Sequence, residues 1–556
     1  MTTTPVYQFA DRAWAEYLEL SPIWATVQGI ETWDDRLDDP SPVGRVALSA
    51  LVERWDTEIA ALAADELSVE DTVTVGLMRA VITRFREAEA LRLWEMEALD
   101  QINGPQSLIG ELARFARTDT PVRLENLLKR LAAYPGWIAA HQANVAAGLA
   151  SGRTAPAPVV ERCIAQTRGL VETPVEKSPL MVVGADLPEG QRTRLLAAVR
   201  EYVEPALASW LATLEDYAGH VRAGDGVCHL PDGEAVYRHH ILSYTNLPED
   251  PQAIHDYGLR RLDEIEAAEA SIALELGHES VAALRSFLDS DPENHAHTPA
   301  EMVALAEEWI TRAEAEAPKW FGNPPAEHCE VQAVESHAEQ SAPAGFYYAP
   351  SDDVERPGIY FLNTFDPSSR PLHQVVPMTY HEAVPGHHFQ LTTERHLDQL
   401  PDFRVHGSLL ACGAYVEGWA LYSERLAAEM GLYRTPLERF GAWESEAHRA
   451  ARLVVDTGMH AFGWTRQRSI DVLIERAGLS RLEAEIETDR YLAWPGQALS
   501  YMIGQREIMS LRARLEERDG DHFDLQAFHD EVIGHGSLPL DVMREQLPDW
   551  VRPKEA

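Results

Sequence analysis

The segment YHEAVPGHH, which runs from Tyr380 to His388, places three histidines and one glutamate within eight consecutive positions. Catalytic zinc sites take three ligands from histidine and glutamate side chains and leave a fourth position to water. A glutamate next to the first ligand can act as the general base. The segment therefore predicts His381 as a zinc ligand and Glu382 as the base of a hydrolase.

The spacing departs from the common H-E-x-x-H form, because Pro385 stands where the second histidine would fall. On a straight helix His387 would lie about 9 Å along the axis from His381 and about 120° around it, and His388 about 10.5 Å away. Proline lacks the backbone N–H, and its ring collides with the carbonyl of the residue four positions earlier. With Gly386 adding backbone freedom, we expect the helix to bulge or break and return one histidine to the metal.

We favour His387 as the second ligand, because Gly386 precedes it directly, as a glycine does in the H-E-x-G-H form of the motif. His388 is the alternative ligand. A polar helix end with unrelated histidines is a further reading, since Pro-Gly pairs commonly end helices.

Four strings in the chain, HEAVPGHH, VEGWALYSE, GMHAFGWTR and PGQALSYMIG, resemble the bacterial domain-of-unknown-function family 885. This family is placed among the thermolysin-like zinc peptidases, near thimet-oligopeptidase-like proteins. The resemblance extends from Ser21-Pro22 near the start to Gly536-Ser537-Leu538-Pro539 near the end. It implies a mainly α-helical, zinc-metallopeptidase-like fold with a cleft or channel at the metal.

The resemblance also implies that Glu417 is the third zinc ligand, because Glu417-Gly418-Trp419-Ala420 is similar to the E-G-F-A string of aminopeptidase-N-like enzymes. It matches Glu382 to the general base. Glu424 follows Glu417 by seven residues and so lies on the same helix face. We expect it to accept a hydrogen bond from the free N–H of a ligand histidine. The alternative for Glu417 is a surface carboxylate.

Peptide hydrolysis needs a hydrogen-bond donor for the developing oxyanion. The candidates are Tyr501, by its similarity to late tyrosines in related peptidases, and His460. Arg490 and Tyr491 are a third candidate, and they could instead hold a substrate carboxylate through a bidentate contact. Gln497, in the turn before Tyr501, is assigned to substrate binding with them. For each residue, a hydrogen-bonded core side chain is an equal alternative.

Two runs rich in aromatic and β-branched residues, 345–350 and 356–364, predict a pair of short strands before the metal motif. In zinc peptidases of this type an edge strand beside the metal helix pairs with the extended substrate. We therefore expect Gly358, Tyr360 and Asn363 to contact substrate. A hairpin that only covers the core is the alternative.

Much of the chain before residue 330 shows apolar residues at three- and four-residue spacing, which predicts helices. The predicted helices are Arg45 to Ala64, Val73 to Glu97, Leu124 to Ala150, Pro188 to Ala218 and Asp250 to Leu276. We expect residues 1–330 to form helices that wall the cleft, and residues 331–556 to form the catalytic region with a small hairpin or sheet. No flexible linker separates them, so one compact unit is expected.

The 556-residue chain carries 48 basic and 89 acidic residues, a net charge of −41. So acidic a surface argues against nucleic acid and anionic membranes as partners. The first residues lack the features of a signal peptide, and no run approaches the length of a membrane span. The four cysteines form no C-x-x-C pair. These features predict a cytoplasmic protein.

The function predicted from these patterns is zinc-dependent hydrolysis, most simply by a metallopeptidase that cleaves short peptides. A zinc amidohydrolase or esterase acting on another substrate would use the same residues. A non-catalytic helical binding protein with a peptidase fold is less consistent with the sequence, because Glu382 is present. The sequence does not fix the oligomeric state.

Overall fold

The computed structural model describes residues 4–64, 66–334, 343–350, 357–397 and 399–553. Helices contain 71% of the chain and strands 3%, which confirms the predicted mainly α-helical fold.

The α-helices before residue 330 are α1 (Pro5–Leu20), α2 (Pro22–Val27), α3 (Pro42–Leu62), α4 (Val69–Ala90), α5 (Leu108–Phe115), α6 (Pro121–Ser151), α7 (Ala157–Glu172), α8 (Leu180–Val183), α9 (Glu189–Ala198), α10 (Glu204–Tyr217), α11 (Gly233–Thr245), α12 (Pro251–Glu275), α13 (Val281–Leu288) and α14 (Pro299–Glu316). Those after it are α15 (Leu372–Glu382), α16 (His387–Arg395), α17 (Asp402–Val405), α18 (Gly413–Glu429), α19 (Pro436–His460), α20 (Arg466–Ala477), α21 (Arg481–Ala493), α22 (Ser500–Asp519), α23 (Leu525–Ile533) and α24 (Leu540–Trp550).

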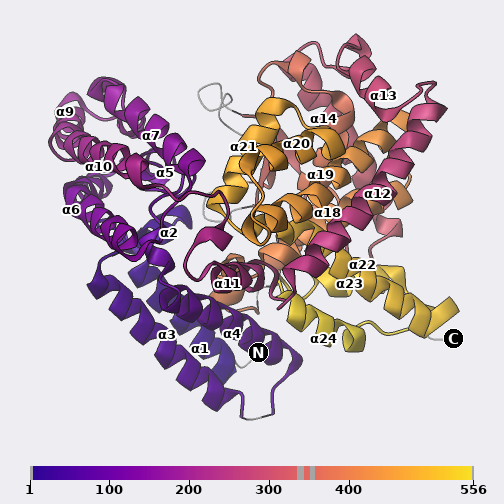
Figure 1. Cartoon of the computed structure of the whole chain (residues 1–556). Helices are drawn as coiled ribbons and strands as arrows, with labels where there is room; N and C mark the ends of the chain where they lie inside the picture. Colours follow the sequence, from indigo (N-terminus) through magenta and orange to yellow (C-terminus); the bar gives the residue numbers. More distant parts are fainter. Residues whose placement is uncertain (1–3, 65, 335–342, 351–356, 398, 554–556) are drawn as a thin grey trace.

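Figure 1 shows helices α1 to α10 on one side of the molecule and the orange and yellow C-terminal helices on the other. Helix α11 lies between the two groups and packs against α4, α18 and α22. Helices α12, α13 and α14 lie with the C-terminal group, although they precede residue 330 in sequence.

Five of the long helices begin with a shared two-residue signature, a serine, threonine or aspartate followed by proline. The first side chain accepts a hydrogen bond from a backbone N–H of the first turn, and the proline fits the first helical position, where its missing N–H costs nothing. Examples are Ser41-Pro42, Thr120-Pro121, Asp250-Pro251, Thr298-Pro299 and Thr435-Pro436. Local sequence therefore fixes where these helices start.

The helices predicted from periodicity are present, with two differences. The helix predicted to run to Glu97 ends at Ala90, and Arg92 adopts a left-handed conformation with φ of 55°. The segment predicted as one helix from Pro188 to Ala218 contains a π-helical stretch at Val199–Val203 between α9 and α10. Pro205 follows this stretch, and a proline cannot complete the regular α-helical hydrogen bond, so the wider turn relieves the clash.

Helix α19 is the centre of the C-terminal group. Every residue from Ala450 to His460 is buried, and the helix packs against α12, α15, α18, α20 and α21. Helix α14 packs against α15. Helices from before residue 330 therefore contact the helices that carry the metal motif directly, and one cluster of buried apolar residues extends from Val6 to Val551.

Helices α18 and α22 approach each other closely through Gly418 and Gly504. A Cβ atom on Gly418 would lie 2.4 Å from the Cα of Gly504, and a Cβ on Gly504 would lie 1.9 Å from the carbonyl oxygen of Ala414. Only glycine permits this separation at both positions. The contact brings the helix that carries Glu417 against the helix that begins with Ser500 and Tyr501.

The strands form one three-stranded sheet in the order β1 (Glu330–Ala333), β3 (Ile359–Leu362), β2 (Gly345–Tyr348). Strand β3 pairs in parallel with β1 and antiparallel with β2. The predicted pairing of the two runs is confirmed, although Arg356 lies outside the described residues. The prediction that the second run is an edge strand is wrong, because β1 occupies its other side.

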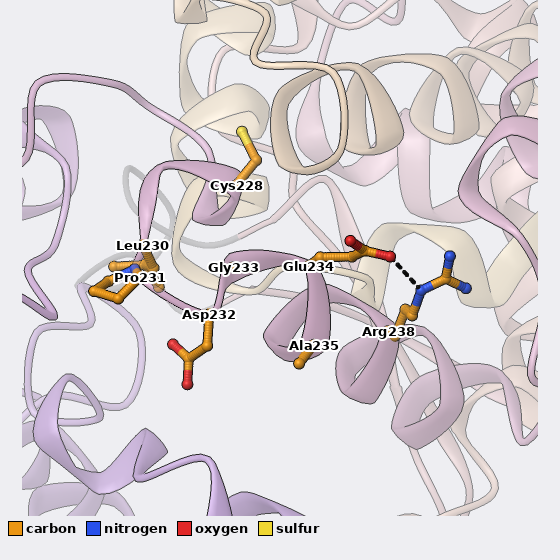
Figure 2. A pocket seen from close by; sticks show the side chains of 8 residues that line it. All are labelled: Cys228, Leu230, Pro231, Asp232, Gly233, Glu234, Ala235 and Arg238. Carbon is orange, nitrogen blue, oxygen red and sulfur yellow. Dashed lines mark hydrogen bonds and ion pairs between the residues drawn. The ribbon is translucent and has the colours of Figure 1, made fainter.

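The structure has a surface hollow of about 520 Å³ beside the start of α11 (Figure 2). It is lined by residues between Cys228 and Arg238, and the Glu234 carboxylate accepts a hydrogen bond from Arg238 at its edge. None of its lining residues belongs to α15, α16 or α18. The cleft predicted around the metal motif therefore stays a prediction.

Candidate metal centre

The metal motif spans a complete break between two helices. Helix α15 ends at Glu382 and α16 begins at His387, with backbone angles outside the helical region at Ala383 and Gly386. Trp419 Nε1 and Ser423 Oγ, both on α18, donate hydrogen bonds to the carbonyl oxygen of Pro385 at 3.0 and 3.1 Å. The expected interruption at Pro385 is therefore present, and α18 satisfies the carbonyl that the break exposes.

Gly386 is required by the tight path of this break. A Cβ atom at this position would lie 1.9 Å from the carbonyl oxygen of His381 and 2.5 Å from that of Tyr380. The chain therefore folds back on the end of α15, and the first residue of α16 lies beside the last residues of α15. The two imidazole rings of His381 and His387 have centroids 4.9 Å apart and are nearly perpendicular.

Glu417 completes a set of three ligand atoms with these histidines. Its Oε2 atom lies 3.5 Å from Nε2 of His381 and 3.6 Å from Nε2 of His387. Ligands about 2.0–2.2 Å from a tetrahedral zinc ion are about 3.3–3.6 Å from one another. The observed separations fit this geometry, so the donor set suits a zinc ion.

Two further carboxylates surround the set. The nearest ligand atoms of His381, Glu382 and His387 all lie within 4.8 Å of one another. Glu424 Oε1 lies 2.8 Å from Nδ1 of His381, so that Nδ1–H donates to this carboxylate and the other ring nitrogen, Nε2, faces Glu417. The Nδ1 atom of His387 is buried and has no hydrogen-bond partner among the described residues. We call the five residues His381, Glu382, His387, Glu417 and Glu424 the metal-motif cluster.

The electrostatics of this cluster favour a cation. Burial disfavours the imidazolium form of His381, but hydrogen bonds to Glu417 and Glu424 outweigh it and raise the pKa to about 9. For Glu417, burial opposes ionisation, but hydrogen bonds from both histidines hold its pKa far below the usual range. The Glu417 side chain is 24% exposed, against 4% for His381. The cluster thus combines buried imidazoles with a carboxylate that solvent can reach.

His388, the alternative ligand, is directed away from this cluster. Its Nδ1 lies 3.0 Å from the Tyr347 hydroxyl, and its Nε2 lies 2.9 Å from the carbonyl oxygen of Glu327. Both ring nitrogens are thus engaged, and the ring is fully buried. The structure brings His387, not His388, to His381 and Glu417.

Two of the three candidate oxyanion donors, Tyr501 and His460, are placed differently. The Tyr501 ring lies beside the His381 ring, with centroids 6.4 Å apart. Burial and the nearby Glu417 charge raise the pKa of Tyr501, which keeps its hydroxyl protonated. His460 is fully buried, with Nδ1 accepting from the Val227 N–H and Nε2 hydrogen-bonded to the Tyr491 carbonyl. His460 therefore has no free ring nitrogen for an oxyanion, and Tyr501 remains the candidate.

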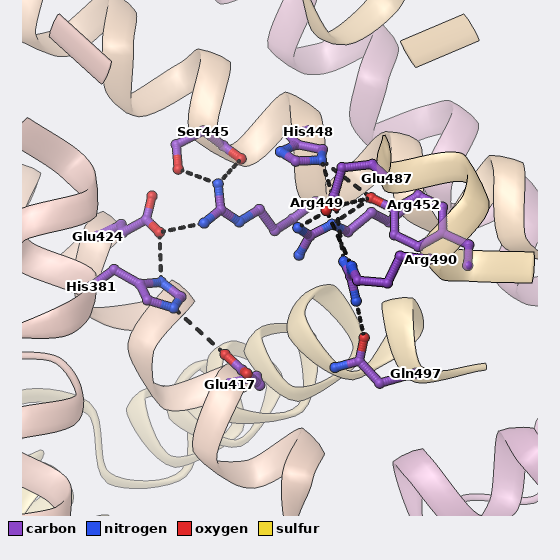
Figure 3. A network of polar contacts seen from close by, with 11 residues as sticks. His381, Glu417, Glu424, Ser445, His448, Arg449, Arg452, Glu487, Arg490 and Gln497 are labelled. Carbon is purple, nitrogen blue, oxygen red and sulfur yellow. Dashed lines mark hydrogen bonds and ion pairs between the residues drawn. The ribbon is translucent and has the colours of Figure 1, made fainter. Parts of the chain in front are cut away.

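The side chains predicted to bind substrate before Tyr501 form hydrogen bonds within the protein. They are Arg490, Tyr491 and Gln497. Arg490 donates to both carboxylate oxygens of Glu487, at 3.1 and 2.8 Å, and to Oε1 of Gln497 at 2.6 Å. The Tyr491 hydroxyl donates to Glu487 at 2.6 Å. The bidentate contact expected of Arg490 thus exists, but its partner is Glu487. Figure 3 shows these contacts.

The three substrate-binding residues predicted on the second strand are also held by the protein. Tyr360 and Asn363 are fully buried, and the Gly358 carbonyl accepts from the Glu330 N–H. The Asn363 N–H donates to the Ala344 carbonyl. Because β3 is the central strand, its backbone has no open edge for a substrate, and the reason for assigning these residues to substrate binding is lost.

Three further polar residues, Arg452, His448 and Glu487, were not predicted from the sequence. They form a network with Arg490 (Figure 3) and with the Tyr491 hydroxyl. We call Arg452, Glu487, Arg490 and Tyr491 the arginine cluster. Helix α19 carries His448 and Arg452 in the stretch AHRAARLVV, where an arginine interrupts a run of buried apolar residues. A buried arginine is rare unless it is paired, and this exception to the helical pattern is the feature that could have revealed it.

The structure thus defines a helical protein in which two histidines and a glutamate from three helices converge. The chain belongs to the family described as bacterial protein of unknown function (DUF885), whose sequence pattern matches residues 22–547. This confirms the family predicted from the four strings. No match was found among curated proteins.

Two solved structures share this fold. One is of a putative lipoprotein from Colwellia psychrerythraea, with a TM-score of 0.88 and 26% sequence identity over 98% of both chains. The other is of a putative lipoprotein of unknown function from Shewanella oneidensis, with a TM-score of 0.78 and 20% identity over 98% of this chain and 99% of that chain. Neither description names an activity.

The predicted cytoplasmic location is contradicted by the similarity to the Colwellia psychrerythraea protein, which is described as a putative lipoprotein and matches almost the whole chain. The prediction relied on charge and on the first residues of the sequence, and neither reports where the protein acts. Within the described residues, no helix is long and apolar enough to cross a bilayer.

Proposed function

We propose that this protein is a zinc-dependent hydrolase, and specifically a metallopeptidase that cleaves short peptides. The observation that carries the proposal is the separation of 3.5 and 3.6 Å between the Glu417 carboxylate and the two imidazole Nε2 atoms. Three ligands of the types His, His and Glu, with a fourth position for water, are typical of catalytic rather than structural zinc sites. The surplus of carboxylates around the imidazoles is consistent with a resident cation.

Zinc held by His381, His387 and Glu417 would supply a Lewis acid and lower the pKa of water to about 7. Glu382, whose carboxylate lies within 4.8 Å of the histidine ligand atoms, is placed to accept the proton of that water and to pass it to the leaving amine. Glu424 fixes the orientation and tautomer of His381 through the 2.8 Å contact to Nδ1.

Tyr501 is the proposed donor to the oxyanion. Its ring lies beside that of His381, with centroids 6.4 Å apart, and it is close enough to Glu417 for that charge to raise its pKa. A raised pKa keeps its hydroxyl proton available near neutral pH. A hydroxyl donor aimed at the developing negative charge would stabilise the transition state more than the ground state.

The peptidase assignment, as opposed to another zinc-dependent hydrolysis, comes from the similarity of HEAVPGHH and VEGWA to thermolysin-like peptidase motifs. The two-residue insertion between the ligands is the main departure from those motifs. In this chain the helix break at Pro385 and Gly386 accommodates it, because His387 opens a new helix instead of continuing the old one.

The experiment that tests the proposal is metal analysis of the purified protein combined with cleavage of a random peptide mixture. We expect about one zinc per chain, and cleavage that stops on chelation and returns with added zinc. A parallel assay with N-acyl amino acids and simple esters separates a peptidase from an amidohydrolase or esterase. A protein that binds no zinc and cleaves none of these substrates would refute the proposal.

A further inference from the structure

Arg452 is buried with one of its nitrogens unused. It is 7% exposed, and its Nε donates to the Tyr491 hydroxyl at 2.9 Å and its Nη2 to Glu487 at 3.0 Å. Its Nη1 is buried without a hydrogen-bond partner among the described residues. Arg490 is different, because all three of its side-chain nitrogens donate to Glu487 or Gln497.

The arginine cluster also carries more positive than negative charge. Arg452 and Arg490 share one carboxylate, that of Glu487. His448 lies beside that carboxylate, but burial and the Arg452 charge lower its pKa to about 3, so it is neutral. The nearby Asp456 is held by Tyr237 and the Gly496 N–H, and burial raises its pKa to about 7. An excess guanidinium in a buried site of a chain with a net charge of −41 calls for an anion.

The unused nitrogen belongs to a side chain beside the proposed metal site. The guanidinium carbon of Arg452 lies 4.4 Å from the centre of the Tyr501 ring, and the Tyr501 ring centre lies 6.4 Å from that of His381. Tyr501 thus lies near both groups. One or two residues of extended peptide, at about 3.3–3.6 Å each, have a length similar to these two distances.

We propose that Arg452 binds the free C-terminal carboxylate of the substrate, so that the protein removes one or two residues from the carboxyl end of short peptides. This inference rests on the proposed hydrolase function and specifies its substrate class. Arg452 is therefore a binding residue, with Glu487 and Tyr491 holding its guanidinium in place. The carboxylate would accept from Nη1 and neutralise the excess charge, while the scissile carbonyl lies near Tyr501 and the metal-motif cluster.

The test compares two matched mixtures of tetrapeptides, one with free carboxyl termini and one with the same sequences amidated. Zinc-loaded wild-type protein is expected to cleave the free acids faster by at least about tenfold, the value of a charge-assisted hydrogen bond. Arg452→Lys and Arg452→Gln are expected to bring the ratio close to one by slowing the free acids. Arg468→Gln, on the exposed part of α20, is the matched control and should leave the ratio unchanged.

Equal cleavage of both mixtures by wild-type protein would overturn the inference, and so would an equal loss on both in Arg452→Gln. Preferential cleavage of amidated peptides that contain aspartate or glutamate would overturn it in favour of side-chain recognition. Mass spectra that show internal cleavage far from the carboxyl end would do the same.

A binding measurement separates this inference from the proposed hydrolysis. In Glu382→Gln, which removes the proposed base so that bound peptide persists, the free-acid mixture should raise the unfolding temperature more than the amidated mixture. The double variant with Arg452→Gln should lose that difference. If wild-type protein cleaves nothing but the difference is present, hydrolysis fails and the carboxylate site stands. If neither mixture shifts the unfolding temperature, the carboxylate site is refuted.

Discussion

The metal-motif cluster and the arginine cluster both lie near Tyr501 and have opposite charge. The first places three carboxylates, those of Glu382, Glu417 and Glu424, around two imidazoles. The second places two guanidinium groups around one carboxylate. The first cluster therefore has an excess of negative charge, and the second has an excess of positive charge. The pair is therefore suited to a cation at one end and a carboxylate-bearing substrate at the other.

The two clusters also differ in how the chain builds them. The metal-motif cluster depends on the seven-residue segment from His381 to His387, which contains the helix break, plus two glutamates, Glu417 and Glu424, on α18. The arginine cluster depends on the packing of α19 against α21, whose residues are thirty-five or more positions apart in sequence. Changes in the first should therefore act on metal and chemistry, and changes in the second on stability and substrate preference.

The largest expected effect is the loss of metal from His387→Ala. Removing one of three ligands should leave zinc below about a tenth of an equivalent after dialysis, and hydrolysis should be lost with it. His388→Ala should retain about one zinc per chain, because both nitrogens of His388 are engaged by Tyr347 and Glu327. Metal analysis of the two variants shows which of the two histidines binds the metal. Loss of zinc only from the His388 variant would reverse the ligand assignment.

Glu382→Gln should separate chemistry from metal binding. The amide cannot accept a proton from water, so the turnover number is expected to fall by about 10²–10⁴-fold with zinc content unchanged. Peptide hydrolysis and metal analysis on the same preparation measure both quantities. Turnover at the wild-type rate would exclude Glu382 as the base.

The sequence predicted the metal-motif cluster well because its residue types and short spacing restrict the chemistry. Histidine, glutamate and the Pro385-Gly386 pair leave few arrangements, and a missing hydrogen bond at Pro385 can be read without a structure. The helices were predictable for a similar reason, since apolar periodicity and the Ser/Thr/Asp-Pro starts are local features. The choice of His387 over His388 depended on one conformational argument, and the structure places His387 rather than His388 beside Glu417.

The sequence could not predict contacts that depend on how distant elements pack. The sequence predicts the strand at β3. It does not predict that residues 330–333 form β1 and pair in parallel with the second edge of β3. Arg490 reads as a free arginine three positions from Glu487, and only the approach of α19 shows that Arg452 competes for the same carboxylate. His460 lies in a promising string, yet the Val227 and Tyr491 backbones that occupy it come from other elements.

Glu487→Gln tests the charge balance of the arginine cluster. It leaves two buried guanidinium groups without a carboxylate, which should cost about 3–5 kcal/mol in the free energy of unfolding. Added formate or acetate should recover part of the loss by acting as a substitute anion. Glu485→Gln, on the same helix and in an ion pair with the exposed Arg481, should cost less than about 1 kcal/mol. Chemical denaturation with and without anion measures the difference, and equal losses in the two variants would contradict the charge argument.

Glu424→Gln is expected to weaken zinc affinity by about 10–100-fold, because a carboxylate that holds a ligand histidine raises the basicity of that histidine. The amide oxygen can still accept from Nδ1 of His381, so binding should weaken without being abolished. Competition with a fluorescent zinc chelator measures the affinity. The control is Glu429→Gln, at the end of the same helix and paired with Arg512, and a similar loss in both would argue against a specific role for Glu424.

The smallest expected effect is on stability and concerns His535. Like His381 it lies between two carboxylates, but it has no second imidazole beside it in the metal-motif arrangement. Its ring lies 2.6 Å from Glu70 and 2.8 Å from Glu531. Burial opposes its charge, but hydrogen bonds to Glu531 and Glu70 outweigh burial and raise its pKa to about 9. Since this value exceeds the unfolded value of about 6.5, the pair stabilises the fold fully below about pH 6.5, and this contribution disappears as pH rises through 9.

His535→Gln should therefore lower the free energy of unfolding by about 1–3 kcal/mol at pH 6, with the difference from wild type shrinking toward pH 10. Denaturation at pH 6, 8 and 10 measures it, with His297→Gln at an exposed position as the control. A difference that stays constant or grows with pH would mean that His535 is neutral in the folded protein. Zinc content should not change in this variant, because His535, Glu70 and Glu531 are not part of the metal-motif cluster.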